Sequence, residues 1–213
     1  ILFLLFFLIT KKIKFFDKNL IDKDFKKIQS FHTEAIARVG GILVITTILT
    51  IYFLHFFKNE NITFFVLMGL INFILGFLDD LKIVVSPMKR FTMIIATNLS
   101  LIVFFNFSIL DFEIFILDYL NEMYFFKILL ALMAIFFIIN GSNLIDGFNG
   151  LLGINLLVIN LSILYINLSS TDQNFVIFLI AQIIILICFL IFNFPRAKIF
   201  LGDSGSYLFG AIT

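Results

Sequence analysis

Long apolar runs dominate the 213-residue sequence and constrain its fold more than any other feature. A helix needs about 17–25 residues to cross a bilayer. Runs that approach or reach this length occupy residues 40–57, 62–78, 91–107, 125–139, 151–168 and 175–192. They are apolar on every face, whereas strands of a membrane barrel alternate apolar and polar residues. We therefore predict an all-α, polytopic integral membrane protein with about six full transmembrane helices.

The composition agrees with a membrane protein. Hydrophobic residues make up 62% of the chain, charged residues 14%, and the mean hydropathy is +1.14. This leaves too little polar surface to cover a soluble globule. The single cysteine, Cys188, lies in an apolar run, so neither a disulfide framework nor a cysteine metal site is available. We expect no nucleic acid among the partners.

The two ends of the sequence carry incomplete apolar runs. Residues 1–10 are too few to span a bilayer, and another run begins near Ser204. No basic region precedes the first run and no small-residue cleavage site follows it, which argues against a signal peptide. We predict truncated spans at both ends, so that residues 1–213 form a single transmembrane domain whose N- and C-terminal parts are missing.

The distribution of Lys and Arg predicts the orientation. If residue 11 lies in the cytoplasm, the alternation of spans leaves only Lys58 and Lys127 outside. The other basic residues then fall in inner loops; they are Lys11, Lys12, Lys14, Lys18, Lys23, Lys26, Lys27, Arg38, Lys82, Lys89, Arg90, Arg196 and Lys198. This positive-inside bias predicts a multi-pass protein of the cytoplasmic (inner) membrane.

Aspartates at the ends of apolar runs all fall on the predicted cytoplasmic side: Asp79, Asp80, Asp146 and Asp203. Carboxylates beside hydrocarbon are costly, so they suggest a functional site. Asp79 and Asp80 are adjacent in GFLDDLK, and adjacent helical residues point about 100° apart. One carboxylate could therefore hold a metal while the other faces a second substrate. Two solvated acids that cap a membrane helix are the alternative.

A second polar motif is NGSNLIDGFNGLLG, residues 140–153. Asn140, Asn143 and Asp146 are three residues apart and would follow one side of a helix end. Gly147 and Gly150 allow the backbone to turn or to approach a ligand closely. The combination suits a phosphate, a sugar or a hydrated metal, although a polar helix end with an Asn-Gly turn would also explain it.

The third motif is FNFPRAKIFLGDSGSYLFG, residues 192–210. Pro195 closes one span, Arg196 and Lys198 add positive charge, and residues 202–206 open the next helix. A helix start exposes backbone N–H groups and favours an anion. Alternatively, Asp203 is simply an N-cap, which is worth about 1 kcal/mol.

Together the three motifs predict a site of oxygen ligands for Mg²⁺, which binds through one or two carboxylates plus substrate phosphates. Basic residues share the same predicted face; they are Lys82, Lys89, Arg90, Arg196 and Lys198. This mixture of acids and bases favours a metal-bridged diphosphate over a simple cation pathway.

Four stretches carry a resemblance to a known family: HTEAIARVGG (32–41), GFLDD (76–80), NLIDGFNGL (143–151) and AKIFLGDSGSYLFG (197–210). In this order and spacing they resemble the polyprenyl-phosphate N-acetylhexosamine-1-phosphate transferases (glycosyltransferase family 4). The resemblance covers nearly the whole chain. It implies an all-helical membrane fold and dependence on Mg²⁺, with Mn²⁺ as a substitute. It also implies attack by polyprenyl phosphate on the sugar-linked phosphorus of a UDP-sugar, with release of UMP.

The resemblance also implies roles for individual residues. Asp203 is similar to the family's metal-binding Asp, with Asp80 as a second ligand. Asp79 and Asp80 look like the acids that deprotonate or position the lipid phosphate. Asn143 and Asp146 look like nucleotide-sugar or metal-environment residues. Further residues expected to bind substrate are His32, Arg38, Lys89, Arg90, Asn140, Asn149 and Lys198, where the resemblance does not decide between Lys89 and Arg90.

Two departures bear on the substrate. Asn149 stands where the peptidoglycan branch has a second Asp, and Arg38 and Val39 stand where that branch has Thr-Pro and Met. The chain is thus more similar to the branch that starts O-antigen, teichoic-acid or common-antigen chains. We expect a UDP-N-acetylhexosamine and polyprenyl phosphate as substrates, and a homodimer as the assembly. The pentapeptide transferase of peptidoglycan synthesis, a membrane transporter and an inactive paralogue are the alternatives.

Overall fold

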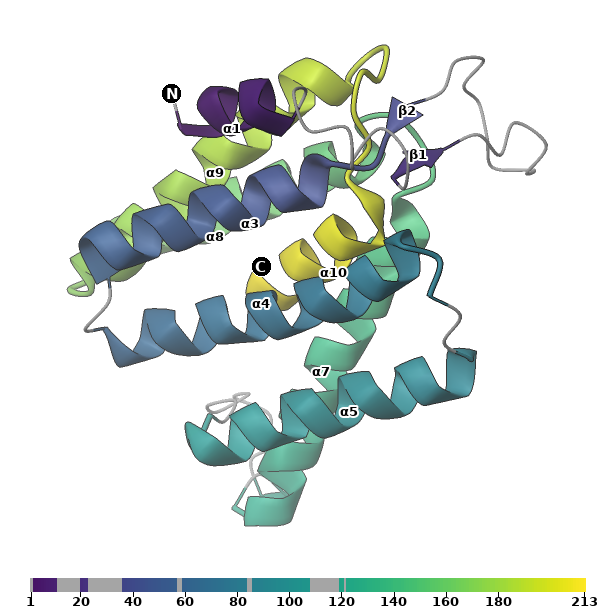
Figure 1. The fold of residues 1–213 in the computed structure, drawn as a ribbon. Coiled ribbons are helices and arrows are strands. Elements are labelled where there is room, and N and C mark those ends of the chain that lie inside the picture. The colour runs from purple at the N-terminus through teal and green to yellow at the C-terminus, as the bar shows by residue number, and fades with distance from the viewer. Residues whose placement is uncertain are drawn as a thin grey trace.

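The computed structural model describes residues 2–10, 20–22, 36–56, 59–83, 86–107, 119–120 and 122–213, and His32 lies outside them. Figure 1 shows a helical molecule with one pair of very short strands. The predicted apolar runs fall largely within helices, which confirms the all-α fold class. The elements are α1 (Leu2–Thr10), β1 (Ile21–Asp22), β2 (Ile36–Ala37), α3 (Gly40–Ile51), the π-helix η1 (Tyr52–Phe56), α4 (Glu60–Asp80), α5 (Pro87–Phe104), α7 (Tyr124–Ile145), α8 (Leu151–Asn167), α9 (Gln173–Asn193) and α10 (Gly202–Ile212).

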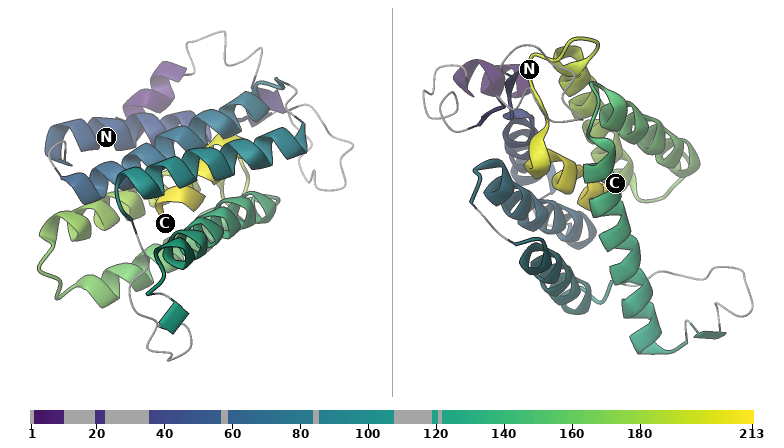
Figure 2. Two further views of the ribbon diagram at one scale, coloured as in Figure 1. Left: turned by 90° about the horizontal axis from the view of Figure 1, so that it is seen from below. Right: turned by 90° about the vertical axis from the view of Figure 1, so that its right-hand side faces the viewer.

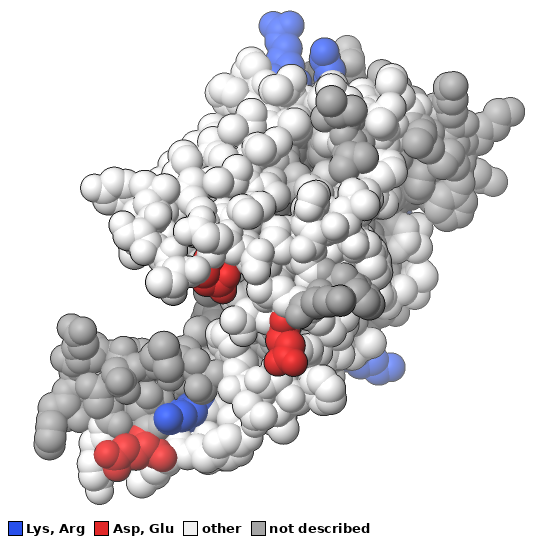
Figure 3. All heavy atoms as spheres, turned by 90° about the vertical axis from the view of Figure 1, so that its left-hand side faces the viewer, with Lys and Arg blue, Asp and Glu red and all other residues white. Residues whose placement is uncertain are grey.

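Helices α4, α7 and α9 are long and apolar enough to cross a membrane, with 21, 22 and 21 residues. Helix α3 continued by η1, and helix α8, are shorter apolar helices. Large apolar side chains also remain on the outside, such as Leu144 and Phe125, which are 82% and 77% exposed. In Figure 3 the described residues of one face include only a few charged side chains, and most of its described surface is uncharged. The chain is a multi-pass membrane protein.

Two helices extend beyond the predicted runs because polar residues continue them. The side chain of Ser86 accepts a hydrogen bond from the backbone of Lys89, and Pro87 follows in the first turn, so α5 begins before Phe91. Helix α7 likewise extends beyond its predicted run, from Ile139 to Ile145. Asn140 and Asn143 therefore lie on a helix, as their spacing predicted.

The short helix α10 lies in the middle of the bundle. It packs most extensively against α4, and also against α7 and α3. All its residues are buried except Asp203, which is half-buried. Figures 1 and 2 show α10 enclosed by the longer helices, with α7 crossing behind it. The first turn of α10 is therefore held by three different segments of the chain.

Glycines permit this close packing. A Cβ atom at Gly76 of α4 would overlap the carbonyl oxygen of Asp203, and one at Gly41 of α3 would lie 2.6 Å from the nitrogen of Gly205. Lipid is as apolar as the helix surfaces, so helices in a membrane associate through close packing and hydrogen bonds rather than through the hydrophobic effect. Gly76, within GFLDD, thus brings the acidic end of α4 onto the start of α10.

The short strands join the starts of α3 and α10. Strands β1 and β2 pair antiparallel, and Ala37 of β2 also bridges Ile199 in parallel. The backbone N–H of Gly40 then donates to the carbonyl oxygen of Phe200 at 2.9 Å. These bonds fix the segment that carries Arg38 beside the segment that leads into Asp203.

Candidate active site

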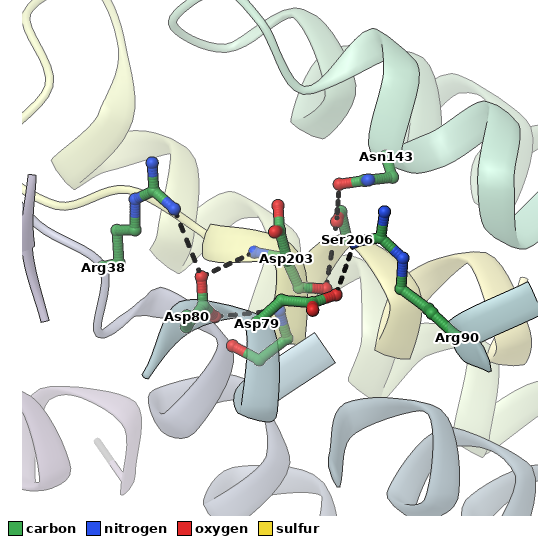
Figure 4. Close-up of polar contacts among 8 residues, drawn as sticks. Arg38, Asp79, Asp80, Arg90, Asn143, Asp203 and Ser206 are labelled. Carbon is green, nitrogen blue, oxygen red and sulfur yellow. Dashed lines mark hydrogen bonds and ion pairs between the residues drawn. The ribbon is translucent and has the colours of Figure 1, made fainter. Parts of the chain in front are cut away.

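Asp80, the last residue of α4, caps the first turn of α10. Its side chain is buried, and the residue is 2% exposed. Its Oδ1 accepts the backbone N–H of Asp203 at 3.0 Å, and its Oδ2 accepts that of Ser204 at 2.9 Å (Figure 4). The first N–H groups of a helix lack partners within it, and a negative charge at that end is favourable. Asp80 therefore stabilises a helix start that lies far from it in the sequence.

Gly202 makes this approach possible. Its φ of 78° is a left-handed conformation that side chains disfavour. A Cβ atom there would also lie 2.6 Å from Oδ2 of Asp80. The glycine before Asp203 is needed both for the backbone turn and for contact with the capping carboxylate.

Asp203 itself is not the N-cap, contrary to one sequence interpretation. Leu201 occupies the N-cap position, and Asp203 lies in the first turn of α10. Figure 4 shows its carboxylate rising from the helix start between Arg38 and Asn143. Asp80 therefore caps the helix in its place, and Asp203 is half-buried in the first turn.

Arg38 approaches Asp80 from the segment after β2. Its Nη1 lies 3.6 Å from Oδ1 of Asp80, and its side chain is 26% exposed. The guanidinium thus partly balances the buried carboxylate while it keeps a surface toward solvent. An arginine in this position can also attract an anionic ligand.

Asp79 faces another partner. Its Oδ2 accepts a hydrogen bond from Nη1 of Arg90 at 2.6 Å, and the side chains are 12% and 31% exposed. Lys89, by contrast, is exposed on the first turn of α5. The structure thus joins Arg90 rather than Lys89 to the acid pair. The adjacent acids point to different elements, as their helical geometry predicted.

Asn143 of α7 meets Ser206 of α10. The Ser206 hydroxyl donates to Oδ1 of Asn143 at 3.0 Å and is also 3.2 Å from the carbonyl oxygen of Asp203. With its oxygen engaged in this way, Asn143 has its NH₂ group to offer as a donor. Sequence reasoning did not select Ser206, although its place one turn after Asp203 was a usable signal.

Asp146 follows directly after α7 and completes the group of acids. Burial raises its pKa well above the usual value, the negative charges of Asp203 and Asp80 act in the same direction, and Arg38 lowers it. The residue nevertheless keeps some exposed surface. Asp146 therefore shares one electrostatic environment with Asp80 and Asp203, as expected from the sequence.

Other predicted site residues make structural contacts or remain apart. The amide of Asn140 donates to the carbonyl oxygen of Phe136 in its own helix at 2.8 Å. The amide of Asn149 donates to the carbonyl oxygen of Pro195 at 3.2 Å. Lys198 is exposed in the loop before α10. Their predicted roles in substrate binding stay predictions.

Asn193 was missed by the sequence reasoning. This buried residue accepts the N–H of Gly150 on Oδ1 at 2.6 Å and donates from Nδ2 to the carbonyl oxygen of Ile199 at 3.0 Å. It thereby joins the loop after Asp146 to the loop before Asp203. An asparagine at the end of a long apolar run was the signal that could have identified it.

The donor set suits Mg²⁺ at Asp203 better than at Asp80. Within the described part of the chain, no group of three or more His, Cys, Asp or Glu residues is arranged to hold a metal ion by itself. Mg²⁺ needs only one or two carboxylates when substrate phosphates and water supply the remaining oxygens. Asp203 and Asp146 can offer such oxygens, whereas the enclosed carboxylate of Asp80 already accepts two N–H groups.

The fold and site together define a polytopic helical membrane protein with an acidic, arginine-flanked site at the helix ends. Its family follows from comparison with known proteins. The sequence model of glycosyl transferase family 4 matches residues 62–213, and the chain belongs to this family.

Similar proteins carry names of phosphosugar transferases. The chain is 30% identical to an undecaprenyl-phosphate alpha-N-acetylglucosaminyl 1-phosphate transferase of Thermotoga maritima, over 96% of this chain and 59% of the relative. It is 32% identical to a phospho-N-acetylmuramoyl-pentapeptide-transferase of Streptococcus uberis, over 76% of this chain and 50% of the relative. A transferase of the latter name from Leuconostoc mesenteroides is 44% identical over 34% of this chain and 22% of the relative. The matched part of the chain thus covers less than two thirds of the length of each of these relatives.

Proposed function

We propose that the protein transfers an N-acetylhexosamine 1-phosphate from a UDP-sugar to polyprenyl phosphate and releases UMP. The observation that carries this proposal is the gathering of acids and arginines around the start of α10. Asp203 and Asp146 share this environment with Asp80 and Arg38. Such a site matches a diphosphate and a metal ion, and family membership supports the reaction class.

In the proposed reaction, an oxygen of the lipid phosphate attacks the sugar-linked phosphorus. The bond from this phosphorus to the bridging oxygen breaks, and UMP leaves with that oxygen. A phosphate monoester has a second pKa of about 6 and is mostly ionised at neutral pH. The nucleophile therefore needs positioning more than deprotonation. We assign this task to Arg90, which Asp79 holds in place.

The remaining residues bind and orient the nucleotide sugar. Asn143 presents amide donors because Ser206 occupies its oxygen, and Arg38 offers positive charge to the diphosphate. Asp203 and Asp146 would hold Mg²⁺, or Mn²⁺ in its place, and Asp80 as a direct ligand remains a less favoured prediction. When bound, the ion supplies charge neutralisation for the diphosphate. Phosphoryl transfer depends mainly on such positioning and electrostatic stabilisation.

We further propose a role at the cytoplasmic face of the inner membrane, in starting a cell-envelope glycan such as the O-antigen of lipopolysaccharide. The positive-inside bias supports this orientation. The Arg38-Val39-Gly40-Gly41 sequence supports an N-acetylhexosamine donor. The muramoyl-pentapeptide nucleotide of cell wall synthesis is the second candidate, because some relatives carry that name. Assembly as a homodimer stays a prediction.

The test is a transfer assay with the full-length protein in lipid nanodiscs. UDP-N-acetylglucosamine, undecaprenyl phosphate and Mg²⁺ should together yield UMP and a lipid-linked sugar, and omission of any one should abolish the product. Asp203→Asn should lower turnover about 100-fold or more, as expected for a group that stabilises transition-state charge. Asn155→Leu is the matched control, because Asn155 is exposed and donates to the carbonyl of Leu151 in its own helix.

Other results would overturn the proposal. Transfer from UDP-N-acetylmuramoyl-pentapeptide, with none from UDP-N-acetylglucosamine, would identify the second candidate as the donor substrate. Full activity of Asp203→Asn would refute the assigned site. Ion flux in liposomes, with no transfer from either nucleotide sugar, would favour a transporter.

A further inference from the structure

A reciprocal pair of amides joins α4 and α5 inside the bundle. Asn72 and Asn98 are 0% and 1% exposed. Nδ2 of Asn72 donates to Oδ1 of Asn98 at 3.0 Å, and Nδ2 of Asn98 donates to Oδ1 of Asn72 at 3.2 Å. Each Nδ2 also donates to a carbonyl of its own helix, that of Met68 and that of Ile94. Both amides are therefore fully satisfied as donors, and each oxygen has its partner.

The amide pair sits at the centre of a narrow contact. The buried residues of α5 are Ile94, Asn98 and Ile102, which follow one another at intervals of four along one stripe. The two isoleucines alone would tolerate a shift of α5 along α4, because apolar packing has little directionality. A shift by one turn, about 5.4 Å, would separate the two amides in apolar surroundings. Unpaired buried amides are costly, so a single polar position can fix the register of packed helices.

The register that the amide pair fixes also brings Asp79 and Arg90 into contact. Asn72 lies two helical turns before Asp79 in α4, and Asn98 lies about two turns after Arg90 in α5. The two helices are joined by a short connection and run in opposite directions, so both offsets lead toward the same end of the bundle. There Nη1 of Arg90 meets Oδ2 of Asp79 at 2.6 Å. The register of α4 and α5 that pairs Asn72 with Asn98 is therefore also the register that pairs Asp79 with Arg90.

We infer that Asn72 and Asn98 are positioning residues that set Arg90 against Asp79. They lie away from the reacting groups and act through the relative register of α4 and α5. The inference rests on the proposed function only where it assigns the Asp79–Arg90 pair to the lipid phosphate. As a statement about register, it stands on the four hydrogen bonds and the burial of the amides.

The decisive variant is the double substitution Asn72→Leu with Asn98→Leu in the full-length protein. Either single substitution leaves one buried amide unpaired and can prevent folding, whereas the double variant replaces the pair by apolar side chains of similar size. The charge coupling is then measured in both backgrounds with Asp79→Ala, Arg90→Ala and their combination, because an asparagine at position 79 could still accept a hydrogen bond from Arg90. In the parent, the two losses of melting temperature should be less than additive, because the first substitution already breaks the pair. In the double-leucine background they should become additive.

The transfer assay adds a second readout. If Arg90 is displaced, the KM for polyprenyl phosphate should rise while the KM for the UDP-sugar stays the same, and turnover should fall at least about 10-fold, since a misplacement of about 1 Å can cost about 100-fold. Asn155→Leu, at an exposed position of α8, should change neither the KM for polyprenyl phosphate nor the turnover. Melting temperatures that still couple Asp79 to Arg90 in the double-leucine background would overturn the inference. Absence of any transfer by the parent protein would instead count against the proposed function, and the coupling measurement would still decide the register.

Discussion

Replacing Asp80 by asparagine tests the most specific consequence of the structure. The two carboxylate oxygens of Asp80 accept N–H groups from Asp203 and Ser204. An asparagine of the same shape has one oxygen and one NH₂ group. One N–H can still be accepted, but the other then faces a donor. Asp79→Asn is the matched control, because its amide oxygen can still accept from Arg90.

The expected magnitudes follow from these contacts. Hydrogen bonds to charged groups contribute about 1.5–3 kcal/mol, and a buried donor without a partner costs about 1–3 kcal/mol. We therefore expect Asp80→Asn to lower the free energy of unfolding by about 2–4 kcal/mol. For a chain of this size that corresponds to a melting temperature lower by about 5–15 °C. Asp79→Asn should cost less than about 1 kcal/mol, because its ion pair with Arg90 is partly exposed.

Hydrogen exchange provides the local assay. In detergent or nanodiscs, at least one of the two amides of Asp203 and Ser204 should lose protection in Asp80→Asn, and both should keep it in Asp79→Asn. The reasoning would be refuted by unchanged exchange at these two amides, or by equal loss of melting temperature in the two variants. Either result would mean that α10 begins without the cap from α4.

Two more predictions concern packing and charge. Gly76→Ala should destabilise the fold by about 1–3 kcal/mol, because the new methyl group meets the Asp203 carbonyl. A Cβ atom at Gly141 would meet open space, so Gly141→Ala should leave the free energy of unfolding unchanged or raise it by up to about 1 kcal/mol through helix propensity. Thermal melts of the two variants measure the difference. Equal effects would contradict the close packing at Gly76. Asp146→Asn should raise the melting temperature at neutral pH in EDTA, because the raised pKa of Asp146 means that its ionised form destabilises the folded state. That cost is absent below the unfolded pKa of about 3.9 and grows as the pH rises toward the folded pKa, so the variant's advantage should vanish near pH 4; an advantage independent of pH would disprove the assignment.

The sequence alone was sufficient for the membrane class and for the approximate helices. Backbone groups in a bilayer must bond within their own segment, so long apolar runs such as 175–192 could hardly be anything but helices. Local signals also placed the acids correctly. Asp80 ends α4, Asp146 follows α7, and Asp203 lies in the first turn of α10. The spacing of Asn140 and Asn143 on one helix was equally local.

The sequence could not predict which residues of distant segments contact each other. The rotation of each helix and the depth of its packing decide where a side chain points, and both depend on contacts across the whole bundle. The choice of Arg90 over Lys89 is one such case, since both are basic and adjacent. The pairing of Asn72 with Asn98 is another, because each asparagine looks like an isolated polar residue in its own apolar run.

The same reason explains the two aspartates of GFLDD. Their adjacency predicted that they would face different directions, because neighbouring helical residues point about 100° apart. It could not tell which one is buried. The tertiary structure decided this by placing Gly76 and Gly202 where α4 and α10 approach closely. Asp80 therefore became the cap of α10, and Asp79 became the partner of Arg90.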